Sequence, residues 1–509
     1  MNKSRTEMAA KNVIWGYSNT LITTALKFIC RWAFINTVGV TFLGINGLYS
    51  SILGVLSLTE LGIGTAMNYS LYKPVAENDI EKIKSLMTFY KTAYRFVAAV
   101  IAVLGLSLTP FLQYLIKGAD NVDHLTLYYL LFLFNTVSSY FVSYKYSLAG
   151  ADQKYYIVNN INTVATILMN LAQIIVLFLF KSFLAYLIIQ IVFLLFIKVY
   201  ASFYLDKMYP FLKDKDVQTL DSATKNTLFR NVRALIVHKL GDVAVNQTDN
   251  IIISAVINIG ITGLVSNYTL ITGTVDSFLG ILFGNITGSL GNLIATSDKK
   301  KQLEIFRVYD FVSFWLFGFA AIAYTALIQP FSELMWGEKY VVKGAAVFLI
   351  ILNTYIVGQR VPLANMKIAA GVFQEDKLLP ALQAVVNLAV SIVLAYKIGL
   401  VGVYVGTIVS GLVPTIIRPI IVYRKLFDQC VLEYFKIYIK HFFIILIIGL
   451  LNERICSIVL STINWQRFIL AMLITGLFPN VILLLIYRNS VEVGYLKRVG
   501  ARILSKFLH

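Results

Sequence analysis

Long apolar segments separated by short polar segments run through almost the whole chain. A helix needs about 20 predominantly apolar residues to cross a hydrocarbon core roughly 30 Å thick. About fourteen segments approach or exceed this length. The predicted spans are 13–38, 43–71, 87–116, 125–148, 155–180, 183–205, 234–258, 262–294, 308–331, 344–369, 378–396, 400–423, 437–452 and 466–487. The pattern therefore predicts an all-α integral membrane protein with about fourteen transmembrane helices.

Segments in the two halves of the chain repeat in the same order at a nearly constant spacing. Residues 44–50 read GINGLYS, and residues 260–266 read GITGLVS, 216 positions later. Residues 170–177 (NLAQIIVL) and 387–394 (NLAVSIVL) match at a spacing of 217. This order predicts two parallel six-helix repeats around a central cavity, which is a transporter architecture.

The repeats divide the chain into four predicted parts. These are an N-lobe at 1–205 with helices 1–6, a charged cytoplasmic linker at 206–233, a C-lobe at 234–423 with helices 7–12, and two extra helices with a cytoplasmic tail at 424–509. The loops predicted to lie outside the cell are no longer than about a dozen residues, which is too short for a folded domain.

Composition and charge agree with a membrane protein. The chain is 58% hydrophobic and 14% charged, with a mean hydropathy of +0.74, whereas soluble proteins carry about 25% charged residues. The net charge is +18. If the N-terminus is cytoplasmic, 29 Lys and Arg fall in inside loops and 7 in outside loops. Topology therefore accounts for the charge, both termini are predicted to be cytoplasmic, and no nucleic-acid partner is expected.

Four cations within predicted spans are candidates for binding an anionic headgroup: Lys27, Arg31, Lys239 and Arg360. Lys27 and Arg31 stand four residues apart on one face of the first span, and Arg360 lies two residues before Pro362 in the tenth. Intramembrane cations are rare and costly, and the planar guanidinium suits phosphate. As alternatives, Lys27 and Arg31 reach the outer interface or neutralise a carboxylate. Lys239 has the alternative of a local ion pair with Asp242.

Four carboxylates within predicted spans are candidates for coupling transport to a proton or Na⁺: Glu60, Asp242, Asp249 and Asp276. Asp249 lies deepest on the polar face of the seventh span, so it is the first choice. Glu60 and Asp276 are 216 positions apart and occupy matching places in the two repeats. A desolvated carboxyl group can exchange protons near neutral pH. The alternative for this pair is a structural role within each lobe.

Other polar residues have simpler expected roles. Arg95, Lys198 and Arg418 lie nearer to span ends and are expected to extend to the membrane surface. The three cysteines show no metal-ligand spacing, and the chain has no P-loop or nucleophile triad. The sequence therefore predicts a transporter rather than an enzyme, with no metal and no cofactor.

Several short motifs resemble a known family. They are TELGIGTA at 59–66, SYKYSL at 143–148, ADQK at 151–154, HKLG at 238–241, TDNI at 248–251 and SNY at 266–268. All six look like stretches of the Wzx-like polysaccharide flippases. That branch belongs to the MOP superfamily, which also holds the lipid II flippase MurJ and the MATE exporters.

The resemblance implies a flippase of the bacterial cytoplasmic membrane. Its substrate would be an undecaprenyl-pyrophosphate-linked oligosaccharide, moved from the inner to the outer leaflet for capsule, O-antigen or exopolysaccharide synthesis. Implied partners are the lipid bilayer and possible polymerase and chain-length proteins. The alternatives are a MurJ-like lipid II flippase, a MATE-like antiporter for cationic drugs, and a membrane polymerase, which is disfavoured by the short outside loops.

Overall fold

The computed structural model describes residues 5–60, 63–119, 122–214, 217–222, 224–226, 228, 247–372 and 374–507, and the side chains of these except 5–18, 65, 285, 502–504, 506 and 507. All regular structure in this part of the chain is helical. Packing divides the chain into two compact units, Met1–Gly263 and Leu264–His509. The four parts predicted from the sequence repeats are defined by repeat boundaries. The two packing units do not test those boundaries, so the four parts stay a prediction.

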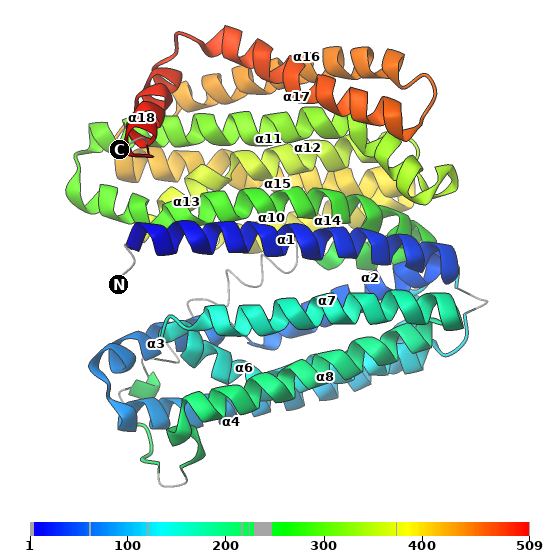
Figure 1. Ribbon diagram of the computed structural model, residues 1–509, viewed down its shortest axis with the longest axis vertical. Helices are drawn as coiled ribbons and strands as arrows, with labels where there is room; N and C mark the ends of the chain where they lie inside the picture. The colour runs from blue at the N-terminus through cyan, green and yellow to red at the C-terminus, as the bar shows by residue number, and fades with distance from the viewer. Residues whose placement is uncertain are drawn as a thin grey trace. The chain divides into compact units, whose positions relative to one another are not determined.

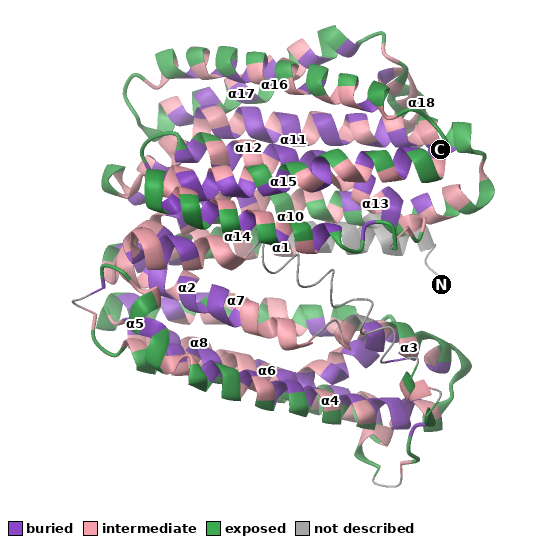
Figure 2. Ribbon diagram, turned by 180° about the vertical axis from the view of Figure 1, so that it is seen from behind, coloured by how far each residue is buried: buried purple, intermediate pink, exposed green. Residues whose placement is uncertain are grey.

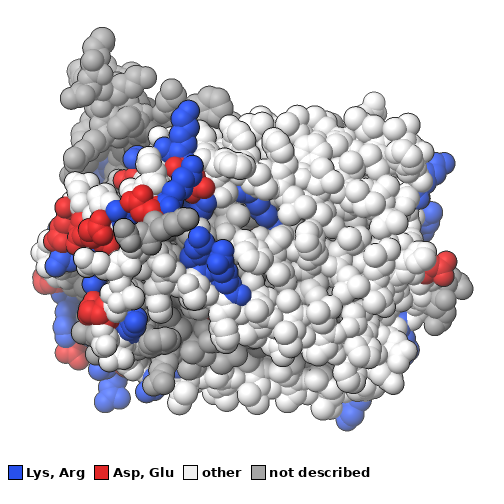
Figure 3. Space-filling view, turned by 90° about the horizontal axis from the view of Figure 1, so that it is seen from below, with Lys and Arg blue, Asp and Glu red and all other residues white. Residues whose placement is uncertain are grey.

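Twelve helices in the described residues are long and apolar enough to cross a membrane. They coincide with twelve of the fourteen predicted spans and confirm the predicted fold class. The first predicted span, 13–38, lies within a further helix, α1 (Arg5–Thr37), except for its last residue. The seventh, 234–258, falls largely outside the described residues. Figure 3 shows one face of the molecule, on which charged side chains gather mainly toward one edge beside a broad uncharged area.

The first unit is a bundle of long helices. They are α1, α2 (Val40–Leu56), α3 (Ile63–Glu77), α4 (Ile80–Ser107), α6 (Leu125–Ala151), α7 (Tyr155–Phe180) and α8 (Phe183–Met208), joined by the short α5 (Leu112–Leu115) and 3₁₀ turns. α6 packs on both α4 and α8, and the three helices run beside one another in Figure 1. Buried and exposed positions alternate along these helices (Figure 2), as expected for helices with one face on protein and one on lipid.

The two repeated glycine motifs contact each other in the first unit. A Cβ atom added at Gly44 of α2 would collide with the backbone carbonyl of Ile259, where α10 (Ile259–Thr296) begins. One added at Gly263 would collide with the carbonyl of Val40. Small residues therefore allow the start of α2 and the start of α10 to cross with their backbones in contact.

The second predicted span, 43–71, is broken rather than continuous. α2 ends at Leu56, a 3₁₀ turn follows at Ser57–Glu60, and α3 resumes at Ile63. The hydroxyls of Ser57 and Thr59 bond to backbone carbonyls three residues earlier, at 2.6 and 2.9 Å. Such local bonds compete with regular helix geometry and accompany the break.

The second unit is arranged around α11 (Lys299–Trp336). The remaining long elements are α10, α12 (Ala346–Gln359), α13 (Val361–Ala369), α14 (Leu379–Ile398), α15 (Leu400–Val422), α16 (Leu432–Val459), α17 (Trp465–Tyr487) and α18 (Val491–Phe507). α11 packs against α12, α16 and α17, while α14 pairs with α15. The extra helices α16 and α17 are thus part of this unit's core. The predicted thirteenth span, 437–452, is too short, because polar residues at both ends of α16 still belong to the helix.

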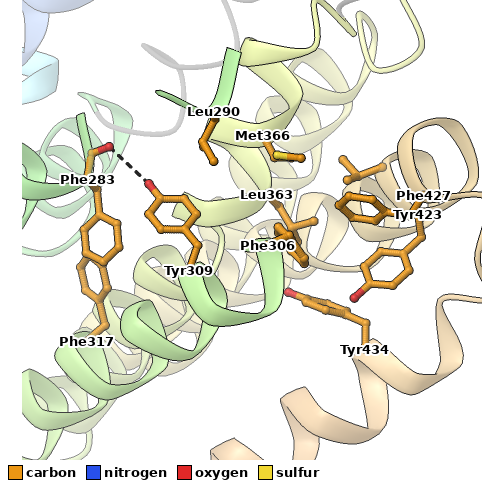
Figure 4. Close-up of a cluster of buried hydrophobic side chains, with 11 residues drawn as sticks. Phe283, Leu290, Phe306, Tyr309, Phe317, Leu363, Met366, Tyr423, Phe427 and Tyr434 are labelled. Atoms are coloured by element: carbon orange, nitrogen blue, oxygen red, sulfur yellow. Dashed lines mark hydrogen bonds between the residues drawn. The ribbon is translucent and has the colours of Figure 1, made fainter. Parts of the chain in front are cut away.

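An aromatic cluster fills the core of the second unit near one end of α11. Phe306 is fully buried, and its ring packs against Tyr423 and Phe427 at centroid distances of 6.0 and 5.2 Å. Figure 4 shows Tyr423 and Tyr434 converging on Phe306. The same cluster includes Tyr309, whose hydroxyl donates to the backbone carbonyl of Phe283 at 3.2 Å. This packing fixes the helices that carry the candidate site.

Candidate functional site

Arg360 stands at a break within a membrane-spanning helix of the second unit. α12 ends at Gln359, and α13 begins at Val361 with Pro362 in its first turn. Proline lacks a backbone donor and favours the start of a helix, so the chain bends at this point. The close approach of α12 to α11 also requires Gly358, because a Cβ there would collide with the ring of Phe317.

The guanidinium of Arg360 is only weakly satisfied within the protein. The side chain is half-buried, and Nη1 donates to the carbonyl of Gly411 on α15 at 3.4 Å. In the part of the chain that the structure describes, no carboxylate lies within ion-pair distance of it. A guanidinium has five N–H donors, so most of its binding capacity stays available.

Arg418 and Lys367 share one buried carboxylate. Asp376 Oδ2 lies 2.6 Å from Lys367 Nζ and 3.3 Å from Arg418 Nε, and the Asp376 side chain has no exposed surface. Arg418 therefore bonds to an aspartate of the loop between α13 and α14, and the expectation that it extends to the membrane surface stays a prediction. Asp376 is thus paired with two cations, and the positive charge of Arg360 lies within electrostatic range of one of them, Arg418.

A second acidic residue fastens the loop that carries Asp376. Glu375 Oε1 lies 3.1 Å from Lys425 Nζ. This hydrogen bond holds the pKa of Glu375, which lies outside the spans, below its ordinary value. The loop between α13 and α14 is thereby attached at two adjacent positions.

In the first unit, the two predicted cations of α1 differ in their surroundings. Lys27 is exposed. Arg31 is half-buried and within electrostatic range of Cys30 and of Tyr186 on α8. Cys30 in turn contacts Gln173 on α7, with a sulfur-to-oxygen distance of 3.9 Å. Their predicted role in headgroup binding stays a prediction.

Lys198 lies inside the first unit and is held by polar groups of α6. Its Nζ donates to the backbone oxygen and to the side-chain oxygen of Asn135, at 2.8 and 2.9 Å, and to Ser138 Oγ at 2.8 Å. The expectation that Lys198 extends to the membrane surface is wrong. Its three ammonium protons have three internal acceptors, so it ties α8 to α6.

The predicted coupling carboxylates occupy separate places. Glu60 lies at the break between α2 and α3, and its Oε1 accepts a hydrogen bond from Tyr94 of α4 at 3.0 Å. Asp276 on α10 is exposed and within electrostatic range of Tyr324 on α11. Asp249 is half-buried, and its neighbour Asn250 donates to Ser51 of α2 at 3.0 Å. Lys239 and Asp242 lie outside the described residues.

The sequence reasoning missed two kinds of charged site. One is the buried pair at the end of each bundle: Lys367 with Asp376, and Lys145 with Asp206 at 2.6 Å. The other is Asp310 on α11. The available signal was the position of Asp310 within the apolar run of 308–331, where a carboxylate is costly. Within the described residues, no group of three His, Cys, Asp or Glu is placed to hold a metal ion.

The fold defined by these helices is one shared by membrane transporters and lipid flippases. The lipid II flippase MurJ, in an inward closed conformation, superposes with a TM-score of 0.62 and 13% identity, covering 94% of this chain and 99% of that one. An inward-facing MATE multidrug transporter of the MOP superfamily gives 0.59 and 14%, covering 78% and 92%. The Vibrio cholerae MATE transporter VcmN, as a point mutant, gives 0.54 and 15%, covering 84% and 100%.

These comparisons concern structure alone. No protein-family model matches the chain. No curated protein matches it either. At 13–15% identity the likeness establishes the fold, and the assignment of a substrate has to come from the site.

Proposed function

We propose that the protein is a flippase that moves an undecaprenyl-pyrophosphate-linked oligosaccharide from the inner to the outer leaflet of the bacterial cytoplasmic membrane. The observation that carries this proposal is Arg360, a cation inside a membrane span with most of its donors unused. The shared fold with MurJ and the MATE transporters supports the general class.

The chemistry of Arg360 fits a pyrophosphate. Its planar guanidinium can donate two parallel hydrogen bonds to phosphate oxygens, and such charge-assisted bonds are about twice as strong as neutral ones. Arg418 and Lys367 add positive potential nearby, although Asp376 already accepts from both. A cationic drug would be repelled by this cluster, so the site disfavours a MATE-like antiporter.

Transport would follow alternating access, with the sugar headgroup inside the protein and the polyprenyl tail in lipid. Lys27, Arg31 and Lys239 are proposed, each by itself, as further cations for the headgroup. A proton or Na⁺ bound at a carboxylate would bias the conformational equilibrium by its differential affinity for the two states. Polymerase and chain-length proteins are proposed to act after translocation.

The test is mass spectrometry of lipid-linked intermediates in cells depleted of the protein. The cells are complemented with wild type, with Arg360→Gln, or with Arg95→Gln, which alters an exposed arginine of α4 and serves as the matched control. We expect one undecaprenyl-pyrophosphate oligosaccharide to accumulate on depletion. Wild type and Arg95→Gln should relieve the accumulation, whereas Arg360→Gln should not.

A lipid II flippase is the second candidate, favoured by the near-complete coverage of MurJ and of this chain. Accumulation of lipid II in the depleted cells would assign that substrate instead. If no lipid-linked intermediate accumulates and the cells become sensitive to cationic drugs, both flippase proposals fail and an antiporter replaces them.

A further inference from the structure

Asp310 interrupts the most deeply buried face of α11. Phe306, Ser313 and Phe314 lie on that face and are fully buried, and Phe317 is nearly so. Asp310 falls between them at helical spacing, roughly 16 Å along the helix from its start at about 1.5 Å per residue. It retains some accessible surface. Among the described residues, nothing forms a hydrogen bond or an ion pair with this carboxylate.

The contacts between α11 and α16 fix what lies opposite Asp310. Phe314 stacks on His441 with a centroid distance of 3.7 Å. On the side nearer the start of α11, Arg307 pairs with Glu433 at 2.6 Å. The two helices run parallel between these contacts. Asp310 therefore faces the segment of α16 between Glu433 and His441.

The same register continues farther along the two helices. A Cβ at Gly318 would collide with Ile445, and one at Gly449 would lie 3.7 Å from Ile322. Each step of four residues along α11, from 314 to 318 to 322, is matched by a step of four residues along α16, from 441 to 445 to 449. The segment of α16 that faces Asp310 therefore belongs to a continuous helix pair, and it carries two tyrosines.

Phenol groups from three elements lie within electrostatic range of the Asp310 carboxylate. Tyr434 and Tyr438 come from α16, Tyr355 from α12 and Tyr423 from the turn after α15. Tyr355 is 3% exposed, and its hydroxyl has no hydrogen-bond partner among the described residues. The site thus combines one carboxylate with a buried hydroxyl, that of Tyr355, that has unused capacity to donate or accept.

We propose that Asp310 and its tyrosines form a proton-binding site, and that Tyr438 connects this site to Arg360. Tyr438 is within electrostatic range of both residues. In the proposed cycle, the hydroxyl of Tyr438 rotates to donate to the carboxylate when Asp310 is ionised. When a proton from water binds a carboxylate oxygen, that donation is lost and the phenol oxygen is released toward the guanidinium. In this proposal the extra helix α16 contributes two tyrosines, Tyr434 and Tyr438, to the coupling site in addition to packing on α11.

The other charged groups near Asp310 are already engaged. Arg307 on its own helix pairs with Glu433, and Lys440 on α16 lies over the ring of Tyr487. His441 stacks between aromatic rings. Arg418 on α15 bonds to Asp376. A proton suits the site better than Na⁺, which needs several strong oxygen ligands, because the oxygens here are one carboxylate and weakly basic phenols.

The proton site is tested by infrared spectroscopy of the purified full-length protein during a pH titration, which needs no substrate. Wild type should show a protonated-carboxyl C=O band that Asp310→Asn lacks. Asp428→Asn, which removes an exposed carboxylate, is the matched control and should keep the band. Tyr438→Phe deletes one hydroxyl and should shift the midpoint by about one pH unit, a tenfold change in proton affinity.

The link to Arg360 rests on the proposed function and is tested separately with inorganic pyrophosphate. Its affinity should change with pH across neutrality more steeply in wild type than in Asp310→Asn, in which only the titration of pyrophosphate itself remains. A band that survives in Asp310→Asn and does not move in Tyr438→Phe would overturn the proton site, as would a midpoint that follows the Na⁺ concentration. If Asp310→Asn does not fold, Tyr438→Phe alone decides. A normal Asp310 band without pyrophosphate binding would refute the function of Arg360 and leave the proton site standing.

Discussion

The carboxylate of Asp376 lies 2.6 Å from the ammonium group of Lys367, and both side chains are almost completely buried. Arg418 approaches the same carboxylate oxygen at 3.3 Å. Removing one partner of a buried ion pair leaves the other charge without compensation, which costs about 3–5 kcal/mol. We therefore expect Asp376→Asn to be strongly destabilising, because it leaves both Lys367 and Arg418 without their carboxylate partner.

Lys367→Met is the informative comparison for this cluster. Arg418 still neutralises Asp376 in that variant, so the loss of stability should be clearly smaller than in Asp376→Asn. Thermal unfolding of both purified variants in one detergent provides the measurement. Equal losses would show that Arg418 does not share the carboxylate in the folded protein.

The repeated glycine motifs lead to a second prediction, which concerns the crossing of α2 with the start of α10. Gly44→Ala would place a methyl group against the carbonyl of Ile259. Backbone cannot yield as a flexible side chain can, so we expect a loss of about 1–3 kcal/mol. Gly47→Ala belongs to the same motif, but its Cβ would lie 3.7 Å from Thr262, an ordinary contact. It should be tolerated.

Unfolding temperatures of the two glycine variants decide whether backbone contact matters at this crossing. A disulfide trapping assay between α2 and the start of α10 adds a second readout. It should lose yield in Gly44→Ala and not in Gly47→Ala. A tolerated Gly44→Ala with unchanged cross-linking would contradict the close crossing.

Much of the fold was predictable because hydropathy reports burial in lipid directly. Twelve predicted spans correspond to helices, since every backbone group in a membrane must be satisfied within its own helix. The ends of the helices and the breaks within them were harder to predict from the sequence. The break at Ser57–Glu60 depends on local hydroxyl bonds, and the length of α16 depends on contacts with α11 that composition does not reveal.

The candidate site was only partly predictable. Arg360 was found because a cation beside a proline in an apolar span is unusual. Lys198 was misplaced at the membrane surface, because its partner Asn135 comes from another segment of the chain. The pairing of Arg418 with Asp376 could not be predicted for the same reason. Asp310 was missed for the same reason, since the tyrosines around it are brought together only by folding.

A third prediction separates structure from coupling at Glu60. Its Oε1 accepts a hydrogen bond from Tyr94 at 3.0 Å, and Glu60→Gln keeps an oxygen acceptor while removing the charge. We expect Glu60→Gln to unfold at nearly the wild-type temperature. Tyr94→Phe removes the donor and should lose about 1.5–3 kcal/mol, as is typical for a bond to a charged group.

The readout for coupling is transport in reconstituted vesicles under an imposed proton or Na⁺ gradient. Loss of gradient dependence in Glu60→Gln, with normal unfolding, would make Glu60 a coupling residue. Unchanged gradient dependence would restrict Glu60 to holding the broken helix against α4.

A final prediction concerns the pH dependence of the segment that follows α8, which is attached to the start of α4. Asp214 pairs with Lys84 at 2.7 Å and Asp221 with Lys82 at 2.9 Å. Hydrogen bonds from Thr224 and Lys82 hold the pKa of Asp221 below its ordinary value. The pKa of this carboxyl is lower when the segment is attached to α4 than when it is detached. Its ionisation therefore stabilises the attached form fully at pH values above the detached pKa of about 4. That stabilisation is lost as the pH falls below this value and through the lower pKa that Asp221 has in the attached form.

The measurement is the mobility of a spin label at Thr219→Cys, an exposed position in the same segment, with the exposed Cys430 changed to Ser. The label should be restrained at neutral pH and become mobile in acid. Asp221→Asn should be mobile at every pH, and high salt should loosen the wild type because exposed ion pairs are screened. If Asp221→Asn keeps the label restrained at neutral pH, the ion pair with Lys82 does not hold this segment.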